Sequence, residues 1–203
     1  VALNYRDHAD EVGAKLPSEP VIFAKAPSSI IGPYDPIKLP RISRQVDYEA
    51  ELAVVIGAKC RNVNESEAMN YVLGFMAAND VTARDLEFRE PIRLFWSKSL
   101  DTFCPIGPGI ALREDVGDPG NLRIICRVNG EVVQDSNTRN MIFDVSKLIS
   151  FISRDMTLIP GDIILTGTPS GVGYFRRPPK YLKHGDIVEV EIEKIGAIRH
   201  RVV

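Results

Sequence analysis

The stretch DYEAELAVVIG, Asp47 to Gly57, places two glutamates one residue apart at the start of a strongly apolar segment. Alternate side chains of a strand leave the same face, so we expect Glu49 and Glu51 to project together beside a hydrophobic interior. Isolated buried carboxylates cost far more free energy than folding can supply. The pair therefore predicts a shared proton, a basic partner or a hard divalent metal.

A third carboxylate follows another apolar run. In YVLGFMAANDVTARD, Asp80 closes the run, and Arg84 and Asp85 come shortly after it. Three carboxylates completed by water suit Mg²⁺ or Mn²⁺, which keep positions open for substrate oxygens. Ordinary surface acids or a salt bridge to Arg84 would explain the same residues without a metal.

Three other motifs carry groups for catalysis or binding. Lys98, within WSKSLDTFCPIGP, has apolar neighbours, so it either reaches solvent or acts as a fixed cation for an anionic intermediate. The loop of PGDIILTGTPSGVG, residues 160–173, could offer backbone N–H groups and the Thr168 hydroxyl to an anion, or could be a structural turn. His8 and Glu11 would share one face of a helix, where the glutamate would make the imidazole a better base.

Composition narrows the function class. With 203 residues and 44% hydrophobic content, the chain can bury the core of one large domain. A net charge of −2 lacks the cationic excess that nucleic acid or anionic lipid favours. No apolar run has membrane-spanning length, no secretory signal is visible, and the three cysteines show no disulfide or zinc spacing. We expect a soluble cytoplasmic protein, and the first residues, VALNY, predict a missing N-terminal portion.

The periodicity predicts a mainly β protein with a few short helices. Asn129-Gly130 predicts a hairpin, and a second hairpin is expected around Gly196. The expected strands are Val21–Ala24, Leu52–Ile56, Leu122–Val128, Glu131–Gln134, Ile163–Thr166 and Ile187–Ile192, and the expected helices are Glu65–Tyr71, Asp144–Arg154 and a short one holding His8 and Glu11.

Taken in order, the segments NYRDHADE, DYEAELAVVIG, NDVTARD, KSLDTFCPIGP, VNGEVVQ and PGDIILTGTPSGVG resemble the fumarylacetoacetate hydrolase family, especially its shorter prokaryotic type and the acylpyruvate hydrolases. The resemblance spans nearly the whole chain. It implies a single catalytic domain over residues 1–203, a mixed β-sandwich roll, a homodimer, and Mg²⁺ or Mn²⁺ at the centre.

The resemblance also implies roles for individual residues. Glu49, Glu51 and Asp80 would be metal ligands, Lys98 the charge stabiliser, and His8 with Glu11 a base dyad on a lid. The substrate would be held by Gly167 and Thr168, with Arg84 near the metal. Where a substrate-contacting glutamine is expected, this chain has Glu87, which would repel a second anionic group unless it is protonated or paired.

We therefore expect a metal-dependent enzyme that acts on a 2-oxo acid or β-diketo acid through an enolate, and we favour hydrolytic carbon–carbon cleavage of an acylpyruvate-like substrate. Hydroxyheptadienedioate isomerisation or 2-oxo acid decarboxylation passes through the same enolate and ranks close behind. A dehydratase of sugar-derived 2-oxo acids and a catalytically silent member that keeps only a structural ion rank lower. Motifs of this kind define the intermediate better than they define the reaction.

Overall fold

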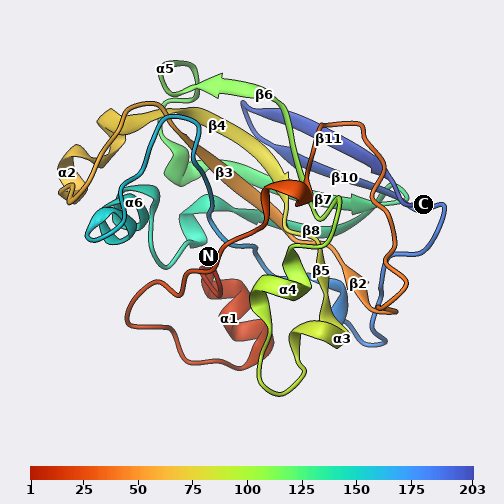
Figure 1. Ribbon diagram of the computed structural model, residues 1–203. Coiled ribbons are helices and arrows are strands. Elements are labelled where there is room, and N and C mark those ends of the chain that lie inside the picture. The colour runs from red at the N-terminus through yellow and green to blue at the C-terminus, as the bar shows by residue number, and fades with distance from the viewer.

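Two packed β-sheets form the body of the protein in the computed structural model, which describes residues 1–203 (Figure 1). The first sheet has the order β1-β6-β4-β3-β9, and only its β1–β6 pair is parallel. Its strands are β1 (Ile30–Ile31), β3 (Ala50–Ile56), β4 (Val72–Asn79), β6 (Cys104–Leu112) and β9 (Ile163–Leu165).

The second sheet is antiparallel, with the order β11-β10-β7-β8. It consists of β7 (Arg123–Val128), β8 (Glu131–Asn137), β10 (Ile187–Ile192) and β11 (Gly196–Arg201), and a small separate ladder pairs β2 (Val46–Asp47) with β5 (Thr82–Ala83). The two larger sheets enclose the main core because each contributes alternate apolar residues to it. Leu52, Val54 and Phe75 come from the first sheet, and Ile124 and Val190 from the second.

The helices are short and lie at the margins of the sheets (Figure 1). They are α1 (Arg6–Val12), α2 (Glu65–Ala68), α3 (Arg84–Glu87), α4 (Leu94–Lys98), α5 (Arg113–Val116) and α6 (Val145–Ser153). Single 3₁₀ turns cover Pro27–Ser29, Met69–Tyr71, Pro119–Asn121, Thr138–Asn140 and Gly173–Phe175. None of the helices combines the length and the apolar character that crossing a bilayer requires.

Most of the expected elements are confirmed. The hairpin turn between β7 and β8 holds Asn129 and Gly130 at φ values of 54° and 82°, the left-handed pair that a type I′ turn needs. The hairpin of β10 and β11 and the helices α1, α2 and α6 are also present. The cysteines Cys60, Cys104 and Cys126 are buried free thiols.

One expected strand is absent, and some observed strands, including β4 and β6, were not among those expected. Val21–Ala24 is not a strand, because only Val21 pairs, through an isolated bridge to Ala2, and the segment runs over the surface. The long strand β6 was not expected. Its sequence contains Gly107, Pro108 and Gly109, which are typical of a turn, yet the strand continues through them with a register irregularity opposite β4.

Candidate active site

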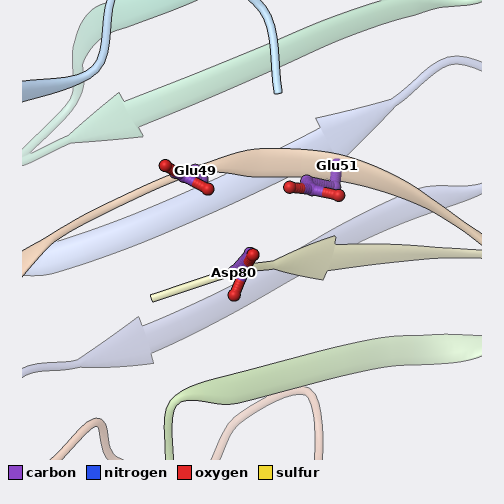
Figure 2. A group of neighbouring side chains, drawn as sticks. All are labelled: Glu49, Glu51 and Asp80. Carbon is purple, nitrogen blue, oxygen red and sulfur yellow. The ribbon is translucent and has the colours of Figure 1, made fainter. Parts of the chain in front are cut away.

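The pairing of β3 with β4 brings the three predicted carboxylates together. Ala50 is paired with Asn79 in the antiparallel ladder, so the preceding Glu49 lies opposite the following Asp80. The Asp80 amide donates to the Glu49 carbonyl at 2.9 Å. Glu51 lies two residues further on the same face of β3, and Figure 2 shows the three side chains grouped there. Ligand oxygens of Glu49, Glu51 and Asp80 lie within 4.8 Å of one another, and all three residues are buried.

This group occupies the face of the first sheet that points away from the main core. Glu51 alternates with Leu52 and Val54, which face the core, and shares its side with Ala53 and Val55. A small second apolar cluster of Ala53, Val55, Met76 and Ala78 adjoins the carboxylates. The predicted position beside a hydrophobic interior is therefore confirmed, although the interior is this second cluster and not the main core.

Two lysines face the carboxylates. Lys98 at the end of α4 is 3% exposed, so it does not reach solvent. Its Nζ donates to Glu49 Oε2 at 2.7 Å, to Asp80 Oδ2 at 3.0 Å and to the Thr82 hydroxyl at 2.7 Å. Lys25 Nζ donates to the other oxygen of Asp80 at 2.6 Å and also to the carbonyl of Lys98. Together they neutralise much of the negative charge that this site places out of water.

Arg84, the first residue of α3, connects three carboxylates. Its Nε donates to Asp47 at 2.9 Å, its Nη2 to Glu49 at 2.6 Å and its Nη1 to Glu87 at 2.9 Å. Asp47 also accepts from the amides of Gly173 and Tyr174, which fixes its position. Salt bridges to Arg84 were the alternative to a metal site. Arg84 does form such bridges, to Asp47, Glu49 and Glu87. Glu51 is left without a cationic side chain in hydrogen-bond contact.

The electrostatics of the carboxylates fit a divalent metal. Burial opposes ionisation of Asp80, but Lys25 and Lys98 outweigh it and lower the pKa of Asp80 to about 2. Burial and the nearby Asp80 carboxylate raise the pKa of Glu51 to about 8. A divalent cation would stabilise the ionised form of Glu51, and carboxylate oxygens that accept one hydrogen bond keep a lone pair for coordination. Three buried carboxylates are also the oxygen donor set that Mg²⁺ and Mn²⁺ prefer.

His8 and Glu11 form a hydrogen-bonded pair on α1. His8 Nδ1 lies 2.8 Å from Glu11 Oε2, and Glu11 Oε1 accepts from the amide of Gly171 at 2.9 Å. Because the carboxylate can only accept, Nδ1 carries the proton when the imidazole is neutral, and Nε2 is left with a free lone pair. The His8 ring packs in a T-shaped arrangement with the ring of Phe175, with 5.9 Å between ring centroids. The imidazole therefore has a defined tautomer and a restricted orientation.

Gly167 and Thr168, which follow β9, have different surroundings. The Gly167 amide donates to Glu51 Oε2 at 2.6 Å, so in this structure it positions a carboxylate of the protein. The φ of Gly167 is +94°, and a Cβ there would lie 2.8 Å from the Cβ of Asn4, so both backbone conformation and space require glycine. The Thr168 hydroxyl accepts from Gln134 Nε2 at 2.8 Å, which leaves its own proton free to donate.

Two cavities adjoin the carboxylate group. The smaller, of about 210 Å³, is lined by His8, Glu49, Arg84, Glu87, Lys98 and Thr168 together with apolar residues that include Phe23, Phe88 and Phe175. Sites for drug-sized ligands span roughly 300–1,000 Å³, so this cavity suits a small molecule. The larger cavity, of about 650 Å³, is mostly apolar and reaches Lys25 and Asp80. Val1 and Phe23 line both cavities.

The structure thus brings the predicted site residues into one region, with His8, Arg84, Glu87, Lys98 and Thr168 on the small cavity and Glu11 and Gly167 just behind it. Sequence reasoning missed Lys25, Asp47 and Gln134. Lys25 carried the same signal as Lys98, a lysine between apolar residues, here in FAKAP. Gln134 ends the motif VNGEVVQ, but the motif does not indicate its contacts with Ala50 and Thr168, because these join distant segments.

Comparison with known proteins finds relatives that match the whole chain. The rat mitochondrial oxaloacetate tautomerase Fahd2a is 51% identical over the whole chain, and the match covers 65% of that protein. A 2-hydroxyhepta-2,4-diene-1,7-dioate isomerase from Mycobacterium marinum is 40% identical with a TM-score of 0.88, and the match covers all of this chain and 72% of that one. A fumarylacetoacetate hydrolase from Exiguobacterium antarcticum is 44% identical with a TM-score of 0.91, over all of this chain and 73% of that one.

The chain spans about 65% of the length of the curated relatives that it matches first. The family model described as the fumarylacetoacetate (FAA) hydrolase C-terminal region matches residues 1–203. These similarities also confirm the mixed β fold expected from the sequence motifs. The chain belongs to the fumarylacetoacetate hydrolase family, whose matched members are tautomerases, isomerases and hydrolases.

Proposed function

We propose that the protein is a metal-dependent tautomerase or isomerase that interconverts the keto and enol forms of a small 2-oxo acid. The observation that carries this proposal is the position of His8 and Lys98 on the same small cavity as Glu49 of the carboxylate group. The apolar residues that line this small cavity suit the transfer of a proton between two atoms of one bound substrate. Several relatives at 50–52% identity are named oxaloacetate tautomerases, which favours tautomerisation over the hydrolysis that the sequence motifs favoured.

Glu49, Glu51 and Asp80 would hold Mg²⁺ or Mn²⁺, whose positive charge would polarise the 2-oxo group and so make the neighbouring C3 proton more acidic. His8 Nε2 would accept that proton, while Glu11 would hold the imidazole in the required tautomer and stabilise its charged form. The Lys98 ammonium, whose three N–H groups donate to Glu49, Asp80 and Thr82, would stabilise the negative charge on the substrate oxygen through space, as a fixed nearby cation. Delivery of the proton from His8 to that oxygen gives the enol, with no atom gained or lost.

The Thr168 hydroxyl would donate to the carboxylate of the substrate, because its oxygen is already fixed by Gln134. Gly167 would act through Glu51 and not by direct contact, since its amide is bonded to that side chain. Arg84 would likewise position Glu49. These assignments keep the predicted residues in the site but move Gly167 and Arg84 from substrate contact to the support of the carboxylates.

Hydrolytic carbon–carbon cleavage is the second candidate. The same His8–Glu11 pair could activate a water molecule for attack on a distal carbonyl, and matched structures include the Exiguobacterium hydrolase. The two reactions differ in their need for water and in their products. Cleavage consumes one water and releases two fragments, whereas tautomerisation releases none.

One experiment distinguishes them. Purified protein is stripped with a chelator, reloaded with Mn²⁺ or Mg²⁺, and given oxaloacetate or acetylpyruvate. Enol absorbance follows tautomerisation, and chromatography follows fragment release. Faster keto–enol exchange that requires metal and His8, without fragments, supports the proposal. Fragment release from acetylpyruvate would establish the hydrolase instead, and neither product with any 2-oxo acid would identify a silent member of the family.

Two further expectations remain proposals. A homodimer is expected from the family resemblance and is tested by light scattering coupled to size-exclusion chromatography, where a monomer would contradict it. A cytoplasmic location is expected from the sequence, but mammalian relatives carry the word mitochondrial in their names. Fractionation of cells that produce the protein from its full gene decides the location.

A further inference from the structure

Glu87 places a carboxylate on the wall of the small cavity. The residue lies in the single turn of α3 and is 6% exposed. Its Oε2 accepts from Arg84 Nη1 at 2.9 Å, and no group of the protein donates to its Oε1. Because Glu87 lines the cavity together with His8 and Lys98, a substrate bound there comes within reach of this acceptor.

The cations that line the cavity are already used by the protein. All three donors of the Lys98 ammonium are taken by Glu49, Asp80 and Thr82. Each nitrogen of the Arg84 guanidinium donates to one carboxylate, so the charge of this residue is shared among three acids. Lys98 has no N–H group left for a second carboxylate of a substrate. The single positive charge of Arg84 is already balanced by three acids, so this residue cannot offset a further negative charge as an unpaired arginine would.

A charge balance of the site leads to the same conclusion. Five buried carboxylates surround it, and three basic side chains with one divalent metal would balance them: Asp47, Glu49, Glu51, Asp80 and Glu87 against Lys25, Arg84 and Lys98. A 2-oxo acid with a single carboxylate adds one negative charge next to the metal and Lys98. A second carboxylate near Glu87 would add another charge in a poorly hydrated place without a cation to offset it.

We infer that Glu87 determines substrate specificity, and that the enzyme takes a 2-oxo acid whose far end is an uncharged hydrogen-bond donor, such as a carboxamide or a hydroxyl, in preference to a dicarboxylate. This inference rests on the proposed 2-oxo acid chemistry of the site. It separates the protein from relatives named for oxaloacetate or heptadienedioate, both of which are dicarboxylates. The uncharged donor would bond to the free Oε1 of Glu87, whereas a carboxylate would be repelled by it.

The test uses two probes that differ only at the far end, oxaloacetate and its 4-amide, 2-oxosuccinamate. Dissociation constants for the Mg²⁺-loaded protein are measured by titration calorimetry, and kcat/KM for enol formation is measured in parallel. The wild type should favour the amide by roughly tenfold or more, and Glu87→Gln should shift this preference toward oxaloacetate by at least roughly tenfold. The exposed Glu114→Gln removes the same charge far from the cavity and should leave the preference unchanged.

A ratio between two probes is independent of the fraction of folded protein, so a partly unfolded variant does not obscure the result. The inference is overturned if the wild type binds oxaloacetate as tightly as the amide, or if Glu87→Gln leaves the ratio unchanged. A shifted binding ratio without turnover supports the role of Glu87 and contradicts the proposed catalysis. Turnover with an unshifted ratio supports the proposed catalysis and contradicts the role of Glu87. If neither probe binds, both the role of Glu87 and the proposed catalysis are overturned.

Discussion

Substitution Glu51→Gln should stabilise the metal-free protein, although it changes a fully buried residue. Burial and Asp80 raise the pKa of Glu51 from 4.5 to about 8, so at pH 7 the folded protein holds this carboxyl mostly protonated. The unfolded chain ionises it. Each pKa unit corresponds to about 1.4 kcal/mol, so this difference costs the wild type about 3 kcal/mol of stability at pH 7. Glutamine avoids the cost and can still accept from the Gly167 amide through its carbonyl oxygen.

The pH dependence has a defined sign. Because the folded-state pKa is raised, the contribution of Glu51 to stability is fully present below pH 4.5 and is lost as pH rises through about 8. The difference in unfolding free energy between Glu51→Gln and the wild type should therefore be smallest near pH 4.5 and should grow toward pH 8. A gain of about 3 kcal/mol at pH 7 corresponds to a rise in Tm of roughly 6–12 °C for a domain of this size.

Urea unfolding in the presence of a chelator, at a series of pH values, measures this difference, with Glu114→Gln as the exposed control. Repeating the series with Mn²⁺ tests the metal site. At 100 times its dissociation constant, the metal should stabilise the wild type by about 2.7 kcal/mol, and it should stabilise Glu51→Gln much less. A variant that is destabilised at every pH, or one that gains as much from Mn²⁺ as the wild type, would refute the reasoning.

Three more predictions concern Lys98, His8 and His200. Replacing Lys98 by Met should lower the unfolding free energy in the presence of a chelator by about 3–5 kcal/mol, because Glu49 and Asp80 lose a buried cation. Urea unfolding measures this loss, and an unchanged unfolding free energy would contradict the ion pairs of Lys98. His8→Asn should lower kcat by roughly 10²–10⁴ with little change in metal affinity; steady-state kinetics that match the wild type would exclude His8 as the base. Burial lowers the pKa of His200, so its contribution to stability is present above pH 6.5 and is lost as pH falls. On acidification, the unfolding free energy of His200→Leu should therefore fall less than that of His184→Gln, a control at an exposed histidine. If the unfolding free energies of the two variants fall equally with pH, the prediction is wrong.

Local sequence determined the parts of the site that depend on short-range geometry. The alternation of a strand is enough to place Glu49 and Glu51 on one face, and a three-residue spacing on a helix is enough to bring His8 within 2.8 Å of Glu11. Asn129-Gly130 likewise specified its hairpin, since few residues tolerate two successive left-handed conformations. Each of these features involves residues only a few positions apart, whose relative placement the backbone alone restricts.

Only the tertiary structure decided how the charges are paired. The register of β3 with β4 sets Asp80 opposite Glu49, and the packing of distant loops brings Lys25 and Lys98 to Asp80. Arg84 reaches Asp47 and Glu49 across more than thirty residues of chain, and the Gly167 amide reaches Glu51 across 116. A sequence of side chains does not specify which buried charges will meet, because that depends on how the whole chain packs. The number of ionisable groups was therefore visible in the sequence, but their partners, and hence their protonation, were not.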